Sequence, residues 1–165
     1  MSGDAGPRAV TMQAGKAGDL LFVYGTLRNN VGHRAHQILA RSAACIGEGR
    51  VRGELYDLGA YPGLVLKEDC CGFVSGELYA IDPANARSTW EALDEYEGCA
   101  PTNPEPHEYA RTEVRVYLPD GGAATAYAYV LQRVRRGAVL IPGGDYLAWL
   151  KTELAFRARG LPAET

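Results

Sequence analysis

Two segments of the chain repeat one pattern, and they constrain its fold more than any other feature. Their sequences are VRGELYDL at Val51–Leu58 and VSGELYAI at Val74–Ile81. In a strand, each places Val, Gly and Leu on one face and Glu and Tyr on the other. A glycine inside a strand marks a bend or a close backbone approach, as at the corner of a barrel. We interpret the segments as two strands that solve the same packing problem; a duplicated unit is the alternative.

Other apolar segments predict further strands. Leu20–Tyr24 is a short continuous apolar run, which is typical of a strand buried on both faces. Glu108–Leu118 alternates in polarity, a PDGG turn follows at Pro119–Gly122, and AATAYAYVLQ returns from Ala123. Four or more antiparallel strands with few free edges favour a small, partly closed barrel.

Helices are fewer. The first is expected over His33–Arg41. Asp82 followed by a proline is a helix start, so the second helix runs from there to about Tyr96 and ends at Gly98. The third begins at Asp145 and ends near Gly160. It is expected to be a packing element because of its apolar residues Leu147, Trp149, Leu150, Leu154 and Phe156.

A proline-rich segment separates the second helix from the strand at Glu108. Ala100–Pro106 contains three prolines, which exclude regular structure. We expect a loop there, and its tip is a suitable place for a flap over a substrate.

Length and charge restrict the class of protein. The chain of 165 residues is long enough for one domain with a substantial core. We place this domain at residues 19–160, between a flexible leader (1–18) and a C-terminal tail (161–165). A net charge of −3 argues against a nucleic-acid partner, and the cluster Arg133, Arg135 and Arg136 is interpreted as a solvated loop. No apolar run approaches the ~20 residues of a membrane-spanning helix, so we expect no membrane partner.

Cysteine and histidine positions bear on compartment and metals. The cysteines lack C-x-x-C spacing, and the adjacent pair is poorly placed to form a disulfide; they are Cys45, Cys70, Cys71 and Cys99. A reduced, cytoplasmic setting fits this pattern. The histidines complete no recognisable zinc ligand set; they are His33, His36 and His107. We therefore expect no metal.

One carboxylate stands out in WEALDEYEG, residues 90–98. Trp90 and Leu93 share an apolar helix stripe, and Glu97 follows them at i+7 and i+4, so its carboxyl is directed towards the core. It also lies at the helix C-terminus, where the dipole disfavours a negative charge. Burial and the dipole both raise its pKa, which suits a general acid–base near neutral pH. The alternative is a glutamate that reaches solvent at the helix end.

The segment Tyr24-Gly25-Thr26-Leu27 follows the first strand. A glycine there permits φ > 0 or close approach of a ligand, and successive free N–H groups can bind an oxyanion. The segment is neither a G-K-[ST] phosphate loop nor G-x-G-x-x-G. By itself it predicts either an ordinary turn or a ligand-binding one.

Several motifs in order along the chain resemble a known family. FVYGTLR follows the first strand, GELY precedes a helix that ends in LDEYEG, and EYARTEVRV comes next. The order resembles the γ-glutamylcyclotransferase-like family, closest to its γ-glutamylamine cyclotransferase branch, over about Leu20–Val130. The resemblance implies an α+β fold: a small, mixed, mostly antiparallel β-barrel with a few flanking helices. It implies neither a metal nor an organic cofactor.

The resemblance also implies roles for residues. The turn of Tyr24, Gly25, Thr26 and Leu27 would bind the glutamyl portion of the substrate, largely through backbone groups. Glu97 would be the catalytic acid–base. Tyr109 and Arg111 match the family's aromatic-x-Arg stretch and are expected near the pocket. Gly59–Val65 has the character of a loop and is expected to form a pocket wall.

The reaction implied is an intramolecular cyclisation. The α-amino group of a γ-glutamyl amide attacks the side-chain carbonyl, which gives 5-oxoproline and a free amine, so no protein nucleophile is needed. The expected partner is a small γ-glutamyl molecule: first a γ-glutamylamine, then a γ-glutamyl amino acid, then glutathione. The sequence predicts no oligomeric state.

Two other functions fit parts of the sequence. A cysteine–histidine hydrolase would use Cys99 and His107, but a thiol at a helix C-terminus has a raised pKa and no third orienting residue is evident. A non-catalytic ligand-binding protein would keep the Tyr24–Leu27 turn and dispense with the acid. The presence of Glu97 favours the enzyme.

Overall fold

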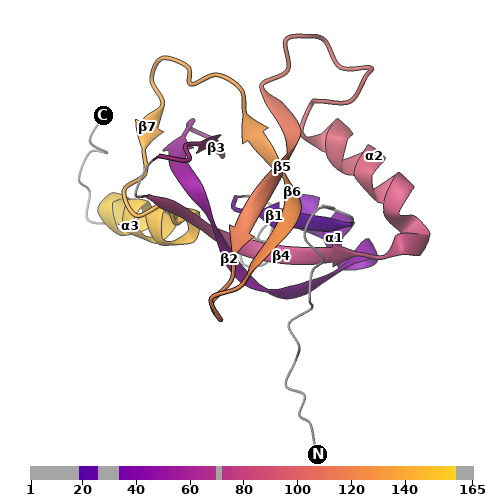
Figure 1. Cartoon of the computed structure of the whole chain (residues 1–165). Helices are drawn as coiled ribbons and strands as arrows, with labels where there is room; N and C mark the ends of the chain where they lie inside the picture. Colours follow the sequence, from indigo (N-terminus) through magenta and orange to yellow (C-terminus); the bar gives the residue numbers. More distant parts are fainter. Residues whose placement is uncertain (1–18, 26–33, 70–71, 159–165) are drawn as a thin grey trace, which may run out of the picture.

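The structure is a computed structural model that describes residues 19–25, 34–69 and 72–158. In this part of the chain seven strands and three α-helices follow one another around a barrel (Figure 1). The strands are β1 (Leu20–Val23), β2 (Ala43–Asp57), β3 (Pro62–Leu66), β4 (Phe73–Ile81), β5 (Tyr109–Tyr117), β6 (Ala123–Leu131) and β7 (Val139–Leu140). The helices are α1 (Arg34–Ser42), α2 (Ala86–Tyr96) and α3 (Tyr146–Ala158), with a 3₁₀ turn η1 (Pro83–Asn85) before α2.

Five strands close into a ring, in the order β1–β4–β2–β3–β6 and back to β1. The β1–β4, β4–β2 and β2–β3 pairs are antiparallel, whereas the β3–β6 and β6–β1 pairs are parallel. β5 extends the ring as an antiparallel partner of β6 and also meets β2. The expected α+β barrel, mixed and mostly antiparallel, is confirmed.

The two strands that carry the repeated segments are neighbours in this barrel, and the segments themselves meet at one pair of residues. Val51 on β2 lies opposite Val74 on β4, and Gly49 lies opposite Gly76. On both strands Val, Gly and Leu of the repeated pattern are buried, as the alternation predicted. A side chain on Gly76 would collide with the backbone oxygen of Val23. The glycine therefore marks the close backbone approach that the sequence indicated.

Two apolar cores hold the molecule together. One fills the barrel and continues onto α3 through Trp149 and Leu150. The other lies between the outer face of the barrel and the helices α1 and α2, which contribute Leu39 and Leu93. In Figure 1 α3 accordingly lies on one side of the barrel and α1 and α2 on the other.

The ends of α2 follow the sequence signals. Asp82 accepts a hydrogen bond from the backbone N–H of Ala84 at 3.0 Å, and Pro83 occupies the first turn. Gly98 ends the helix with φ of +74°, a conformation that favours glycine. The preceding residue, Glu97, is the C-cap. A stop signal in the sequence thus fixes where this carboxylate leaves the helix.

Two expectations need correction, and one strand was missed. Gly59–Val65 was expected to be a loop, but residues from Pro62 onward form β3, which pairs with β2. The short strand β7 was not expected. In α3, Leu154 and Phe156 are not packed inside: they are 63% and 39% exposed. The apolar residues predicted packing along the whole of α3. Its contacts with the core instead come from Trp149 and Leu150 in its first half.

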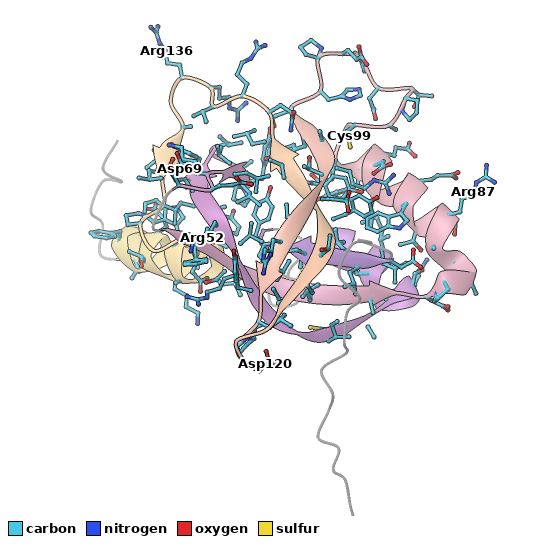
Figure 2. The ribbon with its side chains drawn as sticks, viewed as in Figure 1. Arg52, Asp69, Arg87, Cys99, Asp120 and Arg136 are labelled. Carbon is cyan, nitrogen blue, oxygen red and sulfur yellow. The ribbon has the colours of Figure 1, made fainter. Side chains whose placement is uncertain are left out.

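The hairpin turn and the proline-rich loop occur where they were expected. Leu118 N–H donates to Gly122 O at 2.8 Å across the PDGG turn. Asp120 at its tip lies at the opposite end of the molecule from Cys99, which follows α2 (Figure 2). The Ala100–Pro106 segment contains no helix or strand. Across the described ranges, no helix has both the length and the apolar character needed to span a membrane.

Candidate active site

A cavity of about 450 Å³ opens where β1 ends, and its volume lies within the ~300–1,000 Å³ typical of small-molecule sites. Its wall is aromatic, with two carboxylates. The described residues that line it are Phe22, Val23, Tyr24, Gly25, Ala60, Tyr61, Pro62, Tyr96, Glu97, Gly98, Glu108, Tyr109 and Tyr129. The fold therefore brings Tyr24, Gly25, Glu97 and Tyr109, which are distant in sequence, into one cavity.

Two of the expected binding residues, Thr26 and Leu27, lie outside the described residues. Arg111 is described, but it does not line the cavity. Of the expected wall Gly59–Val65, the cavity uses Ala60, Tyr61 and Pro62. The expected flap at Ala100–Pro106 contributes no lining residue, although Gly98 and Glu108 border the cavity on either side of it.

Glu97 is half-buried, and its carboxyl belongs to the cavity wall. Its backbone N–H donates to Leu93 O at 2.9 Å, so the last helical turn fixes the residue. Burial raises the pKa of Glu97 to about 7, and the negative charge of Glu108 adds to the effect. Near neutral pH this group exists in both protonation states, as proton transfer in both directions requires.

Three tyrosines in the wall use their hydroxyls to hold the structure together. Tyr24 donates to the backbone oxygen of Tyr129, and Tyr109 donates to Pro62 O at 2.6 Å. Tyr129 donates to Asp94 Oδ1 at 2.7 Å. Burial is the main cause that raises the pKa of all three phenols, so they stay neutral at physiological pH. They give the cavity a rigid, uncharged aromatic wall.

Gly25 is required by its neighbour on β3. A Cβ atom at this position would lie 2.6 Å from Cγ of Pro62, closer than real contacts allow. The sequence left open whether the glycine serves a positive φ, a ligand or a plain turn. The structure assigns it a close approach between the end of β1 and the start of β3, which are two sides of the cavity.

Arg111 acts on the outer side of the same wall. Its Nε lies 3.5 Å from Asp94 Oδ1, and its guanidinium carbon lies 4.7 Å from the ring centroid of Trp90 and 5.2 Å from that of Tyr127. Asp94 in turn accepts the hydroxyl of Tyr129, a lining residue. Arg111 is therefore connected to the cavity through two other side chains.

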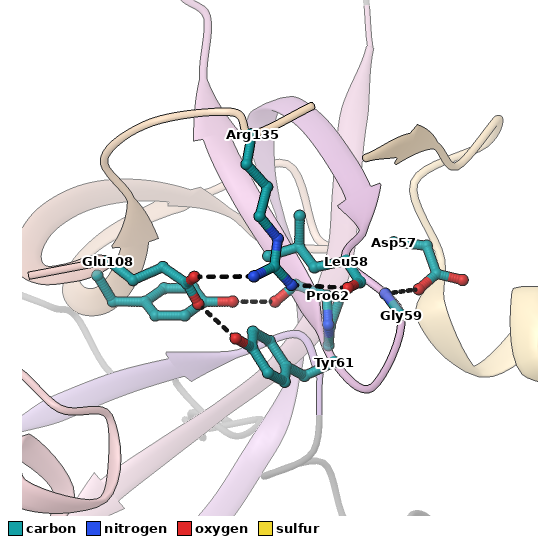
Figure 3. Close-up of polar contacts among 8 residues, drawn as sticks. Asp57, Leu58, Gly59, Tyr61, Pro62, Glu108 and Arg135 are labelled. Atoms are coloured by element: carbon teal, nitrogen blue, oxygen red, sulfur yellow. Dashed lines mark hydrogen bonds and ion pairs between the residues drawn. The ribbon is translucent and has the colours of Figure 1, made fainter. Parts of the chain in front are cut away.

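A second carboxylate, Glu108, faces the cavity with its own partners. Tyr61 donates its hydroxyl to Glu108 Oε1 at 2.7 Å, and Arg135 Nη1 lies 3.6 Å from Oε2. Arg135 Nη2 also donates to Leu58 O at 2.7 Å. Figure 3 shows the carboxylate between the hydroxyl of Tyr61 and the guanidinium of Arg135.

Signals for these additional site residues are weak in the sequence. Glu108 was interpreted as the first residue of an alternating strand, and Arg135 as part of a solvated loop. Tyr61 lay inside the expected wall segment without being singled out. Tyr129 lay in the returning strand that begins at Ala123 without being singled out. Their convergence depends on barrel closure, which brings the β2–β3, α2–β5 and β6–β7 connections together.

The cysteine–histidine alternative gains no support from geometry. Neither Cys99 nor His107 lines the cavity, and His107 Nε2 lies 3.2 Å from Asn103 O. Burial, followed by the charge of Asp94, raises the pKa of the Cys99 thiol, which disfavours the thiolate. Among the described residues, no three Asp, Glu, His or Cys side chains gather in a way that could hold a metal ion.

Comparison with known proteins extends these observations. A relative from Vibrio cholerae serotype O1 is 38% identical over 129 residues, which is 77% of this chain and 94% of that protein. The γ-glutamylcyclotransferase family protein YtfP of Escherichia coli K12 is 36% identical over 128 residues, which is 77% of this chain and 95% of YtfP.

Solved structures show the same fold. The solution structure of Escherichia coli YtfP matches 78% of this chain and 96% of that protein, with a TM-score of 0.53 and 35% identity. The crystal structure of YkqA from Bacillus subtilis matches 83% of this chain with a TM-score of 0.62 and 28% identity, but the match covers only 42% of YkqA. The sequence model of the family described as "Gamma-glutamyl cyclotransferase, AIG2-like" matches residues 21–148. The chain belongs to this AIG2-like γ-glutamylcyclotransferase family.

Proposed function

We propose that this protein cleaves a γ-glutamyl amide by intramolecular cyclisation, releasing 5-oxoproline and a free amine. The observation that carries the proposal is Glu97: a half-buried carboxyl with a pKa raised to about 7, in the wall of an aromatic cavity. A group with this pKa can both accept and return a proton at neutral pH.

Glu97 moves the proton in the proposed reaction. It accepts a proton from the α-amino group while that nitrogen forms a bond to the side-chain carbonyl carbon. It then delivers the proton to the departing amine as the amide C–N bond breaks. The substrate supplies its own nucleophile, so the protein's task is to hold the glutamyl chain bent.

The turn that begins at Tyr24 and Gly25 is proposed to hold the glutamyl portion. Both residues border the cavity, and Gly25 is kept close to Pro62. Backbone N–H groups of the turn would stabilise the oxyanion, which is worth roughly 3 kcal/mol per donor in comparable sites. Thr26 and Leu27 belong to this part of the proposal, and Tyr109 supports it as a rigid wall.

We place the protein in the γ-glutamylamine branch of the family, so that the leaving group is an amine rather than an amino acid. The basis is the Y-G-T-L sequence of the turn and a cavity whose lining carries two carboxylates. The cysteine pattern leads us to propose a cytoplasmic enzyme.

The test is a panel of γ-glutamyl amines, γ-glutamyl amino acids and glutathione, with 5-oxoproline followed by mass spectrometry. Glu97→Gln should lower its release by about 10²–10⁴-fold while the circular dichroism spectrum stays unchanged. Glu95→Gln is the matched control, because Glu95 is an exposed carboxylate two residues away and does not line the cavity. Full activity of Glu97→Gln would refute the proton-transfer role. Binding of glutamyl ligands without turnover of any compound would favour a non-catalytic protein.

A further inference from the structure

The second carboxylate of the cavity transfers no proton in the proposed cyclisation. Glu108 is the residue before β5, and it borders the same cavity as the proposed glutamyl turn. Its side chain is 36% exposed, so it combines access to solvent with a place in the cavity wall. The leaving group must extend from the glutamyl portion towards solvent. This carboxylate is therefore a candidate to bind it.

The chain's own Arg135 shows what Glu108 and Tyr61 can bind together. Its guanidinium carbon lies 5.8 Å from the Tyr61 ring centroid, and its Nη1 lies 3.6 Å from Glu108 Oε2. A carboxylate beside the face of an aromatic ring is a recognised arrangement for an organic cation. The pair thus already holds one positive charge, that of Arg135, which is not among the lining residues (Figure 3).

Glu108 keeps hydrogen-bonding capacity despite these contacts. Oε1 accepts the hydroxyl of Tyr61, but the 3.6 Å distance from Oε2 to Arg135 is too long for a hydrogen bond. An ionised carboxylate offers about four acceptor sites. An ammonium group arriving from the cavity can therefore form a charge-assisted hydrogen bond that is shorter than the 3.6 Å ion pair with Arg135.

The rest of the wall favours the same charge. The described lining residues include no lysine or arginine, and their two ionisable carboxyls are Glu97 and Glu108. Tyr61 and Tyr109 lie side by side with ring centroids 6.1 Å apart and present neutral aromatic surface. Beside Glu108 and Tyr61, such a wall favours an ammonium group over a carboxylate.

We propose that Glu108 and Tyr61 form a subsite for a second, distal ammonium group on the leaving amine. This rests on the proposed cyclotransferase function and narrows its substrate class to γ-glutamyl amides of aliphatic diamines or polyamines. The bonds change as before: the α-amino nitrogen bonds to the carbonyl carbon, the amide C–N bond breaks, and the departing nitrogen takes the proton. The distal ammonium keeps its charge and leaves with the diamine.

Three amides of equal chain length test the subsite. One is a mono-γ-glutamyl diamine, one carries a methyl group in place of the distal ammonium, and one carries a carboxylate there. The wild-type kcat/KM should be highest for the diamine amide, roughly tenfold to hundredfold above the neutral one, and lowest for the carboxylate. Equal values for the diamine and neutral amides, or a preference for the carboxylate, would overturn the subsite.

Two variants should change the diamine preference in opposite directions. Glu108→Gln should reduce the ratio of diamine to neutral amide towards one. Arg135→Gln removes the competing internal cation and should increase that ratio. Glu113→Gln and Arg136→Gln are matched controls, because Glu113 is an exposed carboxylate on β5 and Arg136 points outward from its loop (Figure 2). If both site variants lowered the ratio together, the effect would be structural and the proposed competition wrong.

Binding to Glu97→Gln separates this proposal from the cyclotransferase itself. Calorimetry with the same three amides gives their affinities without turnover. If wild-type enzyme converts none of them, the cyclotransferase proposal fails, and the affinity order still decides whether the subsite selects a cation. If all three are converted with equal kcat/KM and bind equally, the cyclotransferase proposal stands and the subsite is refuted.

Discussion

At the scale of single residues, the site depends on how two carboxyls share one cavity. Glu97 is held at the end of α2, where burial makes its charged form costly. Glu108 adds a negative charge to the same space and disfavours ionisation further. Asp94, only three residues earlier, is held by Tyr129 and Arg111 instead. Neighbouring acids of one helix thus have different environments, and only Glu97 shows the environment of a proton-transfer group.

The pH dependence of the reaction follows from this arrangement. Glu97 must be ionised to accept the amine proton, so kcat/KM should increase as pH rises and level off above about 7. In Glu108→Gln one neighbouring negative charge is lost, which lowers the pKa of Glu97 and moves the inflection to lower pH. Glu113→Gln should leave the inflection at the same pH as in the wild type. A pH–rate profile with a neutral γ-glutamyl alkylamine measures this, and an unchanged inflection in Glu108→Gln would contradict the coupling.

At the scale of secondary-structure elements, α2 must be fixed to the barrel for Glu97 to face the cavity. Leu93 is fully buried in the outer core. Asp94, the next residue, adds a polar connection. Its carboxylate accepts a hydrogen bond from the hydroxyl of Tyr129 on β6 and forms an ion pair with Arg111 on β5. One apolar and one polar anchor therefore hold the last turn of the helix against two strands.

Asp94→Ala should weaken this attachment. Losing the hydrogen bond from Tyr129 and the pair with Arg111 should lower the free energy of unfolding by about 1–3 kcal/mol, measured by urea denaturation. We also expect kcat to fall more than KM changes, because Glu97 loses its fixed position. Glu91→Ala on the same helix is the control; its pair with Arg87 is exposed, with side chains 69% and 94% accessible, and should matter by less than about 0.5 kcal/mol. Equal effects of the two variants would show that Asp94 has no anchoring role.

At the scale of the whole molecule, closure of the barrel creates the site. β1 contributes Tyr24 and Gly25 at its end, the β2–β3 connection contributes Tyr61, and the chain beyond α2 contributes Glu97 and Glu108. These segments meet because β1 pairs with both β4 and β6. Glycines on the strands allow the backbones to come this close.

Gly76→Ala tests closure. The new methyl group would collide with the backbone oxygen of Val23 and with the ring of Phe22, the last two residues of β1. We expect a loss of about 1–3 kcal/mol in the free energy of unfolding and reduced activity, because β1 must shift. Gly122→Ala in the hairpin meets mainly the end of the Asp120 side chain and should change stability by less than about 0.5 kcal/mol. A stable, fully active Gly76→Ala protein would show that β1 tolerates displacement.

Elements with strong local signals could be predicted from the order of residues alone. Asp82, Pro83 and Gly98 specify the start and end of α2, because capping and positive φ are properties of a few neighbouring residues. The alternation of Val51–Leu58 and Val74–Ile81 specifies buried faces for the same reason. Glu97 was predicted to face inward from helical spacing, and the cavity includes it. The motif order also predicted the family.

Which polar groups meet depends on how the whole chain folds. Tyr61, Glu108 and Arg135 belong to three different connections, and nothing local in any of them refers to the others. The strand at Pro62–Leu66 depends on pairing with β2, so its residues looked like a loop by themselves. The exposure of Leu154 and Phe156 likewise depends on where the barrel surface ends. Local conformation follows from neighbours in sequence, whereas pairing and electrostatic coupling act between segments that only chain closure brings together.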